Sequence, residues 1–186
     1  MKKIALLASG SGSNAENIID YFEGNDSLQF PLILSNNKNA YVHERAKQLN
    51  IPSYTINKAG FENGEALKLL LQHEIDFIVL AGFLLKIPQN ILDAYPNRII
   101  NIHPALLPKF GGKGMYGSHV HEAVVANKEK ESGITIHYVN ENYDEGMIIF
   151  QAKCEVLSSD TADDVAEKVH ALEYEHFPKV IESLLF

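Results

Sequence analysis

An amide and an imidazole stand two residues apart in the segment Asn101-Ile102-His103-Pro104. On an extended chain, side chains two residues apart point to the same side, so Asn101 and His103 are expected to project together. Both side chains carry N–H donors that can stabilise a developing oxyanion, and histidine can also move a proton near neutral pH. This pair suits acyl-group transfer, although a purely structural histidine fits the spacing equally well.

A carboxylate follows later in the chain, in the turn Tyr143-Asp144-Glu145-Gly146. Most aspartates in such turns only accept hydrogen bonds from their own backbone, so the local sequence favours a structural role for Asp144. His137 lies in the preceding apolar run, where alternation places it on the same face as Thr135 and Val139. The sequence leaves open whether His137 belongs to the core or lines a site.

Glycines and small polar residues follow the first apolar run, in the segment Gly10-Ser11-Gly12-Ser13-Asn14-Ala15. Glycine lets the chain turn tightly and lets an anion approach backbone N–H groups at the start of a helix. The segment therefore predicts a phosphate site, with a turn that binds no ligand as the alternative. A dinucleotide site is disfavoured because Ser35-Asn36-Asn37-Lys38, after the second expected strand, lacks the acidic residue that binds a ribose.

The remaining reactive side chains are weaker candidates. His119 and His121 have metal-binding spacing only on a strand, and their segment favours the start of a helix, where residues two apart do not share a face. Cys154 has no base nearby in the sequence and is interpreted as a structural thiol. No Gly-x-Ser-x-Gly segment occurs, which disfavours a hydrolase triad. We therefore expect no metal site.

Short apolar runs alternate with segments of helical periodicity in the first half of the chain. The expected strands are Ile4–Ala8, Pro31–Leu34, Ile51–Ile56, Phe77–Leu80 and Arg98–Ile102. The expected helices are one with Ile18, Ile19 and Phe22 on a common face, then Ala40–Leu49, Phe61–His73 with Leu67, Leu70 and Leu71 facing the core, and Pro88–Asp93. This βαβα order predicts a Rossmann-like, doubly wound α/β fold with a mostly parallel sheet.

The second half has a different pattern. Its expected elements are a helix at Ser118–Asn127, two strands at Gly133–Val139 and Met147–Val156, and a long C-terminal helix from Thr161. The two strands predict an antiparallel hairpin, and Ser159-Asp160-Thr161 offers N-cap residues for the helix. The glycine-rich segment Pro108–Gly117 is expected to be a mobile loop over a site. One domain is expected over residues 1–186, with halves at about 1–100 and 101–186.

Composition narrows the range of partners. The 186 residues carry a formal net charge of −8, which disfavours a nucleic-acid binder, because such proteins present a basic surface. A single cysteine excludes an intrachain disulfide and favours a cytoplasmic protein. The run Ile4–Ala8 is too short for a signal peptide, and no stretch approaches the roughly 20 apolar residues of a membrane span. The expected partners are small molecules, without nucleic acid or membrane.

The segment Asn101-Ile102-His103-Pro104-Ala105-Leu106-Leu107-Pro108 resembles the signature of the folate-dependent formyltransferases. Asp144 matches the third catalytic position of that family, and Gly133–His137 and Ile149–Gln151 also fit the family pattern. The resemblance covers essentially the whole chain. Among members of the family, Ser9–Asn14 is most similar to the loop that holds the phosphate of glycinamide ribonucleotide.

The resemblance implies a reaction. The formyl group of 10-formyltetrahydrofolate, a co-substrate, would pass to the amine of 5′-phosphoribosylglycinamide through a tetrahedral intermediate, as a one-carbon transfer in purine biosynthesis. Asn101 and His103 would stabilise the oxyanion. Asp144 would pair with His103, favour its protonated form and help relay a proton through water to the folate nitrogen. A carboxylate beside an imidazole is expected to raise the pKa of the imidazole.

The resemblance also implies binding residues. The nucleotide would be bound at its phosphate by Gly12, Ser13 and Asn14, and elsewhere by Glu173. The folate would be bound by Leu84, Leu85, Lys86, Ile87, Asn101, Asn140, Glu141, Tyr143 and Asp144. One departure is that Asn63-Gly64-Glu65 lacks the arginine with which many members contact the folate. A second is that Phe110–Tyr116 is longer and richer in glycine than usual.

Two alternatives are weighed against this interpretation. A formyltransferase acting on another amine, such as an amino sugar nucleotide, would share Asn101, His103 and Asp144, but the glycine-serine loop argues against it. A non-catalytic nucleotide-binding module would need none of the three residues, so their joint presence argues against that function. The chain is expected to be a monomer or a homodimer.

Overall fold

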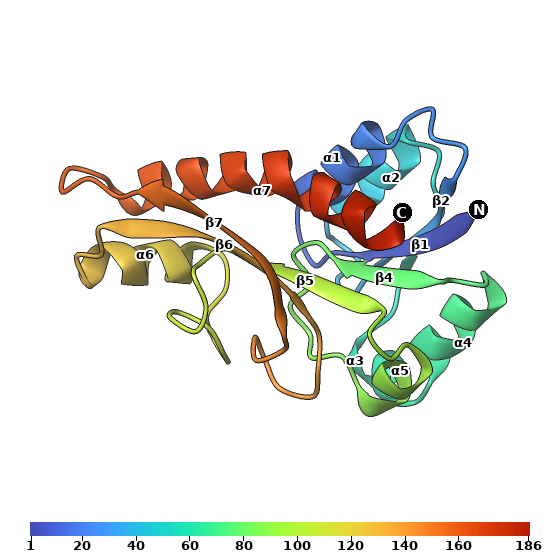
Figure 1. Cartoon of the computed structure of the whole chain (residues 1–186). Coiled ribbons are helices and arrows are strands. Elements are labelled where there is room, and N and C mark those ends of the chain that lie inside the picture. The colour runs from blue at the N-terminus through green and yellow to red at the C-terminus, as the bar shows by residue number, and fades with distance from the viewer. The chain divides into compact units, whose positions relative to one another are not determined.

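The computed structural model describes all 186 residues and contains two compact units, Met1–Asn101 and Ile102–Phe186. The boundary between the units lies one residue from the boundary expected between the two halves. That the chain is a single domain stays a prediction. Figure 1 shows the elements of both units.

The first unit contains parallel strands in the order β3-β2-β1-β4-β5. Their bounds are Lys2–Leu7 for β1, Leu28–Ser35 for β2, Ser53–Thr55 for β3, Phe77–Leu80 for β4 and Ile99–His103 for β5. All four residues of β4 are buried, as expected for a strand that is covered on both faces. Strand β5 runs from the first unit into the second.

Helices cover both faces of these strands. Their bounds are Ser13–Tyr21 for α1, Val42–Gln48 for α2, Lys58–Glu62 for α3, Glu65–Gln72 for α4 and Gln89–Ala94 for α5. Helices α1 and α2 lie on one side, and α3, α4 and α5 lie on the other (Figure 1). This arrangement confirms the doubly wound α/β fold.

One segment predicted as a single helix forms two helices. The expected helix Phe61–His73 is divided into α3 and α4, because Gly64 adopts a left-handed φ of 95° and Asn63 Oδ1 accepts a hydrogen bond from the N–H of Glu65. The start of α4 places Ala66 and Leu70 in the core. Leu71, predicted to face the core, is 57% exposed.

The second unit contains the C-terminal elements. Their bounds are Ser118–Ala126 for α6, Glu131–Tyr138 for β6, Ile148–Glu155 for β7 and Ala162–Leu185 for α7. Strands β6 and β7 pair antiparallel, with Thr135 opposite Gln151, which confirms the predicted hairpin. Helix α7 packs against both strands and against α6.

Two glycines let the hairpin backbone approach itself closely. A Cβ atom on Gly133 would lie 1.9 Å from the carbonyl oxygen of Ala152, and one on Gly146 would lie 1.6 Å from that of Tyr138. Both distances are far below any van der Waals contact, so neither position has room for a side chain.

The C-terminal helix begins where the sequence predicts. The Thr161 hydroxyl accepts a hydrogen bond from the N–H of Asp164, and the Asp164 carboxylate accepts one from the N–H of Thr161. This reciprocal capping box satisfies N–H groups that a helix start leaves unpaired. No helix in the chain combines the length and the apolar character needed to cross a bilayer.

Candidate active site

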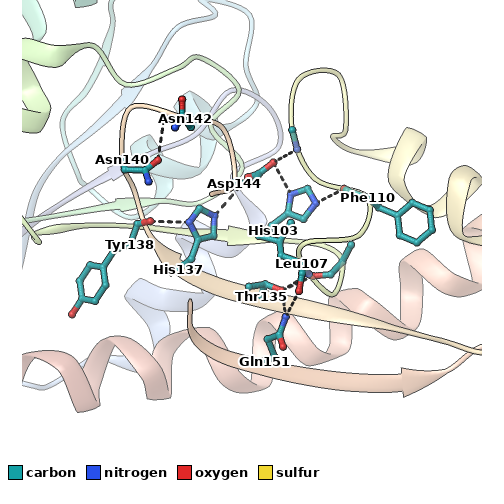
Figure 2. Close-up of polar contacts among 12 residues, drawn as sticks. His103, Leu107, Phe110, Thr135, His137, Tyr138, Asn140, Asn142, Asp144 and Gln151 are labelled. Carbon is teal, nitrogen blue, oxygen red and sulfur yellow. Dashed lines mark hydrogen bonds and ion pairs between the residues drawn. The ribbon is translucent and has the colours of Figure 1, made fainter. Parts of the chain in front are cut away.

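The chain that follows His103 is held in place by the buried side chain of Thr135 on β6. Thr135 Oγ1 donates to the carbonyl oxygen of Ala105 at 2.7 Å and accepts from the N–H of Leu107 at 3.0 Å. Gln151 Nε2 donates to the carbonyl oxygen of Leu107 at 3.0 Å and to Thr135 Oγ1 at 2.9 Å (Figure 2). These bonds tie the chain just after His103 to the β6–β7 hairpin.

His103 ends strand β5 and is only 4% exposed. Its Nε2 lies 2.7 Å from the carbonyl oxygen of Phe110, and its Nδ1 lies 3.6 Å from Oδ2 of Asp144. A carbonyl oxygen can only accept, so Nε2 carries a proton and donates it. Figure 2 shows the imidazole between Asp144 and Phe110.

Asp144 lies in the turn between β6 and β7 with φ 56°, a left-handed conformation that aspartate tolerates better than most residues. Its Oδ2 accepts a hydrogen bond of 2.9 Å from the N–H of Gly112, and its Oδ1 lies 3.6 Å from Nε2 of His137. The local sequence favours a carboxylate that only caps its own turn. In the structure the Asp144 carboxylate also contacts groups outside that turn. It joins two histidines that are distant in sequence.

Burial changes the proton affinity of both partners. Burial lowers the pKa of His103, and this outweighs the opposing effects of the Asp144 charge and the Phe110 carbonyl. The Asp144 carboxylate acts to raise the pKa of His103, as the sequence led us to expect, and burial acts against it. Burial also acts to raise the pKa of Asp144, but the contact with His137, the charge of His103 and the N–H of Gly112 together hold it below its usual value.

A second group of ionisable side chains lies in the same unit, on α6 and α7. Glu173 is buried, and one of its carboxylate oxygens lies 3.0 Å from Nδ1 of His170. This hydrogen bond raises the pKa of His170. His121 is buried without a hydrogen-bond partner for Nδ1, and burial lowers its pKa. The negative charge of Glu173 also reaches His103, whose pKa it acts to raise.

The glycine segment of the first unit turns sharply into helix α1. Gly12 has φ 72°, and a Cβ atom there would lie 2.3 Å from Cγ2 of Val42, so the position requires glycine. Arg45 Nε donates to the carbonyl oxygen of Ser11 at 2.8 Å, and its guanidinium forms an ion pair with Glu16. An anion could therefore come close to the backbone N–H groups at the start of α1.

The family model described as formyl transferase matches residues 2–181 of the chain. The chain belongs to the formyl transferase family. A phosphoribosylglycinamide formyltransferase of Bacillus subtilis is 39% identical over 100% of this chain and 95% of its own length. A chloroplastic protein of the same name from Arabidopsis thaliana is 38% identical over 98% of this chain, which spans 65% of that relative. The crystal structure of a phosphoribosylglycinamide formyltransferase from Streptococcus pneumoniae matches with a TM-score of 0.87 and 37% identity over 100% of both chains.

The remaining residues expected from the formyl transferase pattern occupy varied environments. In the first unit, Asn101 is half-buried on β5, Ile87 is buried, Leu85 is half-buried, and Leu84 and Lys86 are exposed. The Leu84 N–H donates to Ser9 Oγ at 2.9 Å, which joins this segment to the residue before the glycine segment. In the second unit, Asn140 Oδ1 accepts from the N–H of Asn142, and Glu141 and Tyr143 are exposed.

Sequence reasoning missed several members of this candidate site. The Phe110 carbonyl and the Gly112 N–H are backbone groups, so the residue types in the sequence do not predict their part in the site. Gly111 lies between them and has no room for a side chain, because a Cβ atom there would lie 2.5 Å from Cδ2 of Leu107. His137 was left undecided, and alternation on β6 with Thr135 was its only signal. No three of the chain's His, Cys, Asp and Glu side chains are grouped to hold a metal ion.

Proposed function

We propose that the chain transfers the formyl group of 10-formyltetrahydrofolate to the amine of 5′-phosphoribosylglycinamide. The observation that carries this proposal is the buried contact of 3.6 Å between His103 and Asp144, in a chain of the formyl transferase family. The names of the relatives support the choice of amine. So does the backbone at Gly12, which suits a phosphate at the start of α1.

The chemistry begins with attack of the amine on the formyl carbon. The new carbon–nitrogen bond forms a tetrahedral intermediate whose oxygen carries a negative charge. The Asn101 amide and the Nε2–H of His103 would donate to this oxygen, which requires Nε2 to exchange its present bond to the Phe110 carbonyl for one to the oxyanion.

Collapse of the intermediate breaks the bond between the formyl carbon and the folate nitrogen. The attacking amine must lose a proton, and the departing folate nitrogen must gain one, so no net proton is released. Asp144 would relay this proton through water, since its pKa is held low enough to keep the carboxylate ionised near neutral pH. Holding both substrates together supplies a further part of the rate enhancement.

The binding residues in this proposal follow the family pattern. Gly12, Ser13 and Asn14 would bind the phosphate, and Glu173 would contact the nucleotide. Leu84 to Ile87, with Asn101, Asn140, Glu141, Tyr143 and Asp144, would line the folate site. The enzyme would act on these small molecules in the cytoplasm as a monomer or homodimer.

The test is a turnover assay on the purified chain with 10-formyltetrahydrofolate and a set of amines. We expect tetrahydrofolate to form with glycinamide ribonucleotide and not with an amino sugar nucleotide. Turnover only with the sugar nucleotide would favour the alternative formyltransferase. Absence of turnover with every amine, under conditions where both ligands bind, would contradict the enzymatic proposal.

A further inference from the structure

The side chain of Ser9, shortly after the central strand β1, joins three segments of the first unit. Strand β1 pairs with β2 on one side and with β4 on the other, so the chain after β1 is flanked by the residues that follow both neighbours. Ser9 Oγ donates to Oδ1 of Asn36, directly after β2, and accepts from the N–H of Leu84, beyond β4, at 2.9 Å. The N–H of Ser9 donates to the carbonyl oxygen of Gly82 at 2.9 Å.

The direction of each side-chain bond follows from the groups involved. The N–H of Leu84 can only donate, so the Ser9 oxygen accepts there and keeps its single proton for the amide oxygen of Asn36. Ser9 is 8% exposed, so water has little access to compete for its hydroxyl. A buried hydroxyl that both donates and accepts in this way has one defined orientation.

Ser9 holds the chain after β4 at two points. Its N–H and its side chain bond to Gly82 and Leu84, the residues on either side of Phe83. Phe83 is buried, and its ring packs against that of Phe61 with the centroids 5.1 Å apart. Leu84 itself remains 46% exposed. The backbone of this segment is therefore fixed while an apolar side chain stays accessible, which suits a binding surface.

The same serine directly precedes the glycine segment. Helix α2 holds the next two residues, because the Gly10 carbonyl oxygen accepts from the N–H of Val42 at 3.1 Å and the Ser11 carbonyl oxygen accepts from Nε of Arg45 at 2.8 Å. From Ser9 to Ser11, every residue is thus bonded to a group outside the segment. A ligand that orders one end of the segment therefore also restrains the other end.

We propose that Ser9 is a positioning residue that couples the binding of the two substrates. This inference rests on the proposed function, in which the nucleotide phosphate binds at Gly12 and Leu84 lines the folate site. Ser9 does not need to touch either substrate. Its hydroxyl connects the two binding segments, so a ligand that orders one of them lowers the entropy cost of ordering the other.

The inference makes a specific demand on the two affinities. Coupling between two binding sites is reciprocal, so each ligand must strengthen the binding of the other by the same factor. In the wild type, tetrahydrofolate should tighten the binding of glycinamide ribonucleotide by about 5-fold or more, and the nucleotide should tighten the binding of tetrahydrofolate equally. Tetrahydrofolate carries no formyl group, so no transfer takes place during the measurement.

The experiment measures this coupling factor by calorimetry in the wild type and in variants. Ser9→Ala removes the hydroxyl but keeps the backbone bond to Gly82, so the factor should fall by about 2- to 10-fold, the size of one neutral hydrogen bond. Ser132→Ala is the matched control, because it removes a buried hydroxyl on β6 that has no hydrogen-bond partner, and it should leave the factor unchanged. The factor is a ratio of affinities within one variant, so a merely structural loss of affinity cancels.

A second pair of variants changes the partner of the hydroxyl. Asn36→Leu removes the acceptor that orients the Ser9 proton and should lower the coupling factor, whereas Asn36→Asp keeps an acceptor and should retain it. This pair gives the same comparison if Ser9→Ala does not fold. Equal coupling factors in the wild type and Ser9→Ala, or in the two Asn36 variants, would overturn the inference.

A third measurement does not depend on folate binding or turnover. Hydrogen exchange at the N–H of Leu84 should be faster in Ser9→Ala than in the wild type, while exchange at Ala81, whose N–H donates to the carbonyl oxygen of Leu7, should not change. Inorganic phosphate should slow exchange at Leu84 in the wild type and not in Ser9→Ala. A wild type that binds neither substrate would contradict the proposed function, and exchange at Leu84 would still decide whether Ser9 fixes this segment.

Discussion

The cluster around Asp144 and the glycine segment Gly10–Ala15 are built in opposite ways. Asp144 receives its partners from the end of β5, the loop after β5 and strand β6, represented by His103, Gly112 and His137, and burial alters the pKa of the carboxyl and of His103. The glycine segment owes its shape to backbone conformation at Gly12, and Gly10 and Ser11 remain exposed. The proposed proton transfer thus depends on the packing of ionisable side chains, whereas the proposed phosphate binding depends on the backbone of a turn that Arg45 also holds. Substitutions in the two regions should therefore have different effects on activity and stability.

The largest effect is expected at Asp144. Asp144→Asn preserves the shape of the side chain but removes the charge that accepts a proton, so kcat should fall by about 10²- to 10⁴-fold, the range of general acid–base catalysis. The affinity for glycinamide ribonucleotide, measured by calorimetry, should not change. Asp163→Asn, in the exposed first turn of α7, is the matched control and should retain full kcat. A fully active Asp144→Asn enzyme would show that the proton does not pass through this carboxylate.

A smaller effect is expected at the buried hydroxyl that supports the cluster. Thr135→Val keeps the volume but leaves the N–H of Leu107 without its acceptor and the carbonyl oxygen of Ala105 without the hydroxyl that donates to it. The free energy of unfolding in urea should fall by about 1–3 kcal/mol, the cost of a buried unsatisfied polar group. Thr55→Val makes the same change on an exposed residue of β3 and should alter stability by less than about 0.5 kcal/mol. Equal losses in the two variants would contradict the role assigned to Thr135.

The glycine segment should respond to backbone changes rather than to loss of charge. Gly12→Ala forces a Cβ atom into a left-handed conformation and against Val42, and should cost about 1–2 kcal/mol of unfolding free energy. It should also weaken nucleotide binding. Gly10→Ala is the matched control, because no atom lies within 4 Å of its added Cβ, and its stability should match the wild type. If Gly10→Ala were as destabilised as Gly12→Ala, the conformational argument would be wrong.

The smallest effect is expected in the pH dependence of stability. Burial lowers the pKa of His121 below its usual 6.5, so the unfolded chain binds more protons than the folded chain over the interval between the two values. The stability from a neutral, buried His121 is therefore fully present above about pH 6.5 and is lost as the pH falls through that interval. His121→Leu should reduce the loss of stability on acidification, measured by urea unfolding at several pH values. His103 contributes in the same direction, so part of the loss should remain. Identical pH dependence in variant and wild type would refute this assignment.

Sequence patterns predicted the parts of this molecule that depend on local chemistry. Strand β4 was predicted at its observed bounds because four consecutive apolar residues suit a strand covered on both faces. The cap Thr161 was one of three predicted cap residues, since a cap side chain acts on its own helix. Leu71 was misplaced because a side-chain cap from Asn63 and a left-handed glycine decide where α4 begins. The lowering of the pKa of His103 by burial could not be predicted, because spacing does not reveal how much solvent a side chain loses.

The two glycines of the β6–β7 hairpin have a consequence for how Asp144 is kept in place. Gly133 faces the carbonyl of Ala152, and Gly146 faces that of Tyr138, at distances that exclude any other residue. A strand that slipped by one position would bring a side chain against these carbonyls and would turn every residue to the opposite face. Mispaired hairpins are therefore rejected sterically while the chain folds. The two residues without side chains thus select the one alignment in which the turn presents its carboxylate to both histidines.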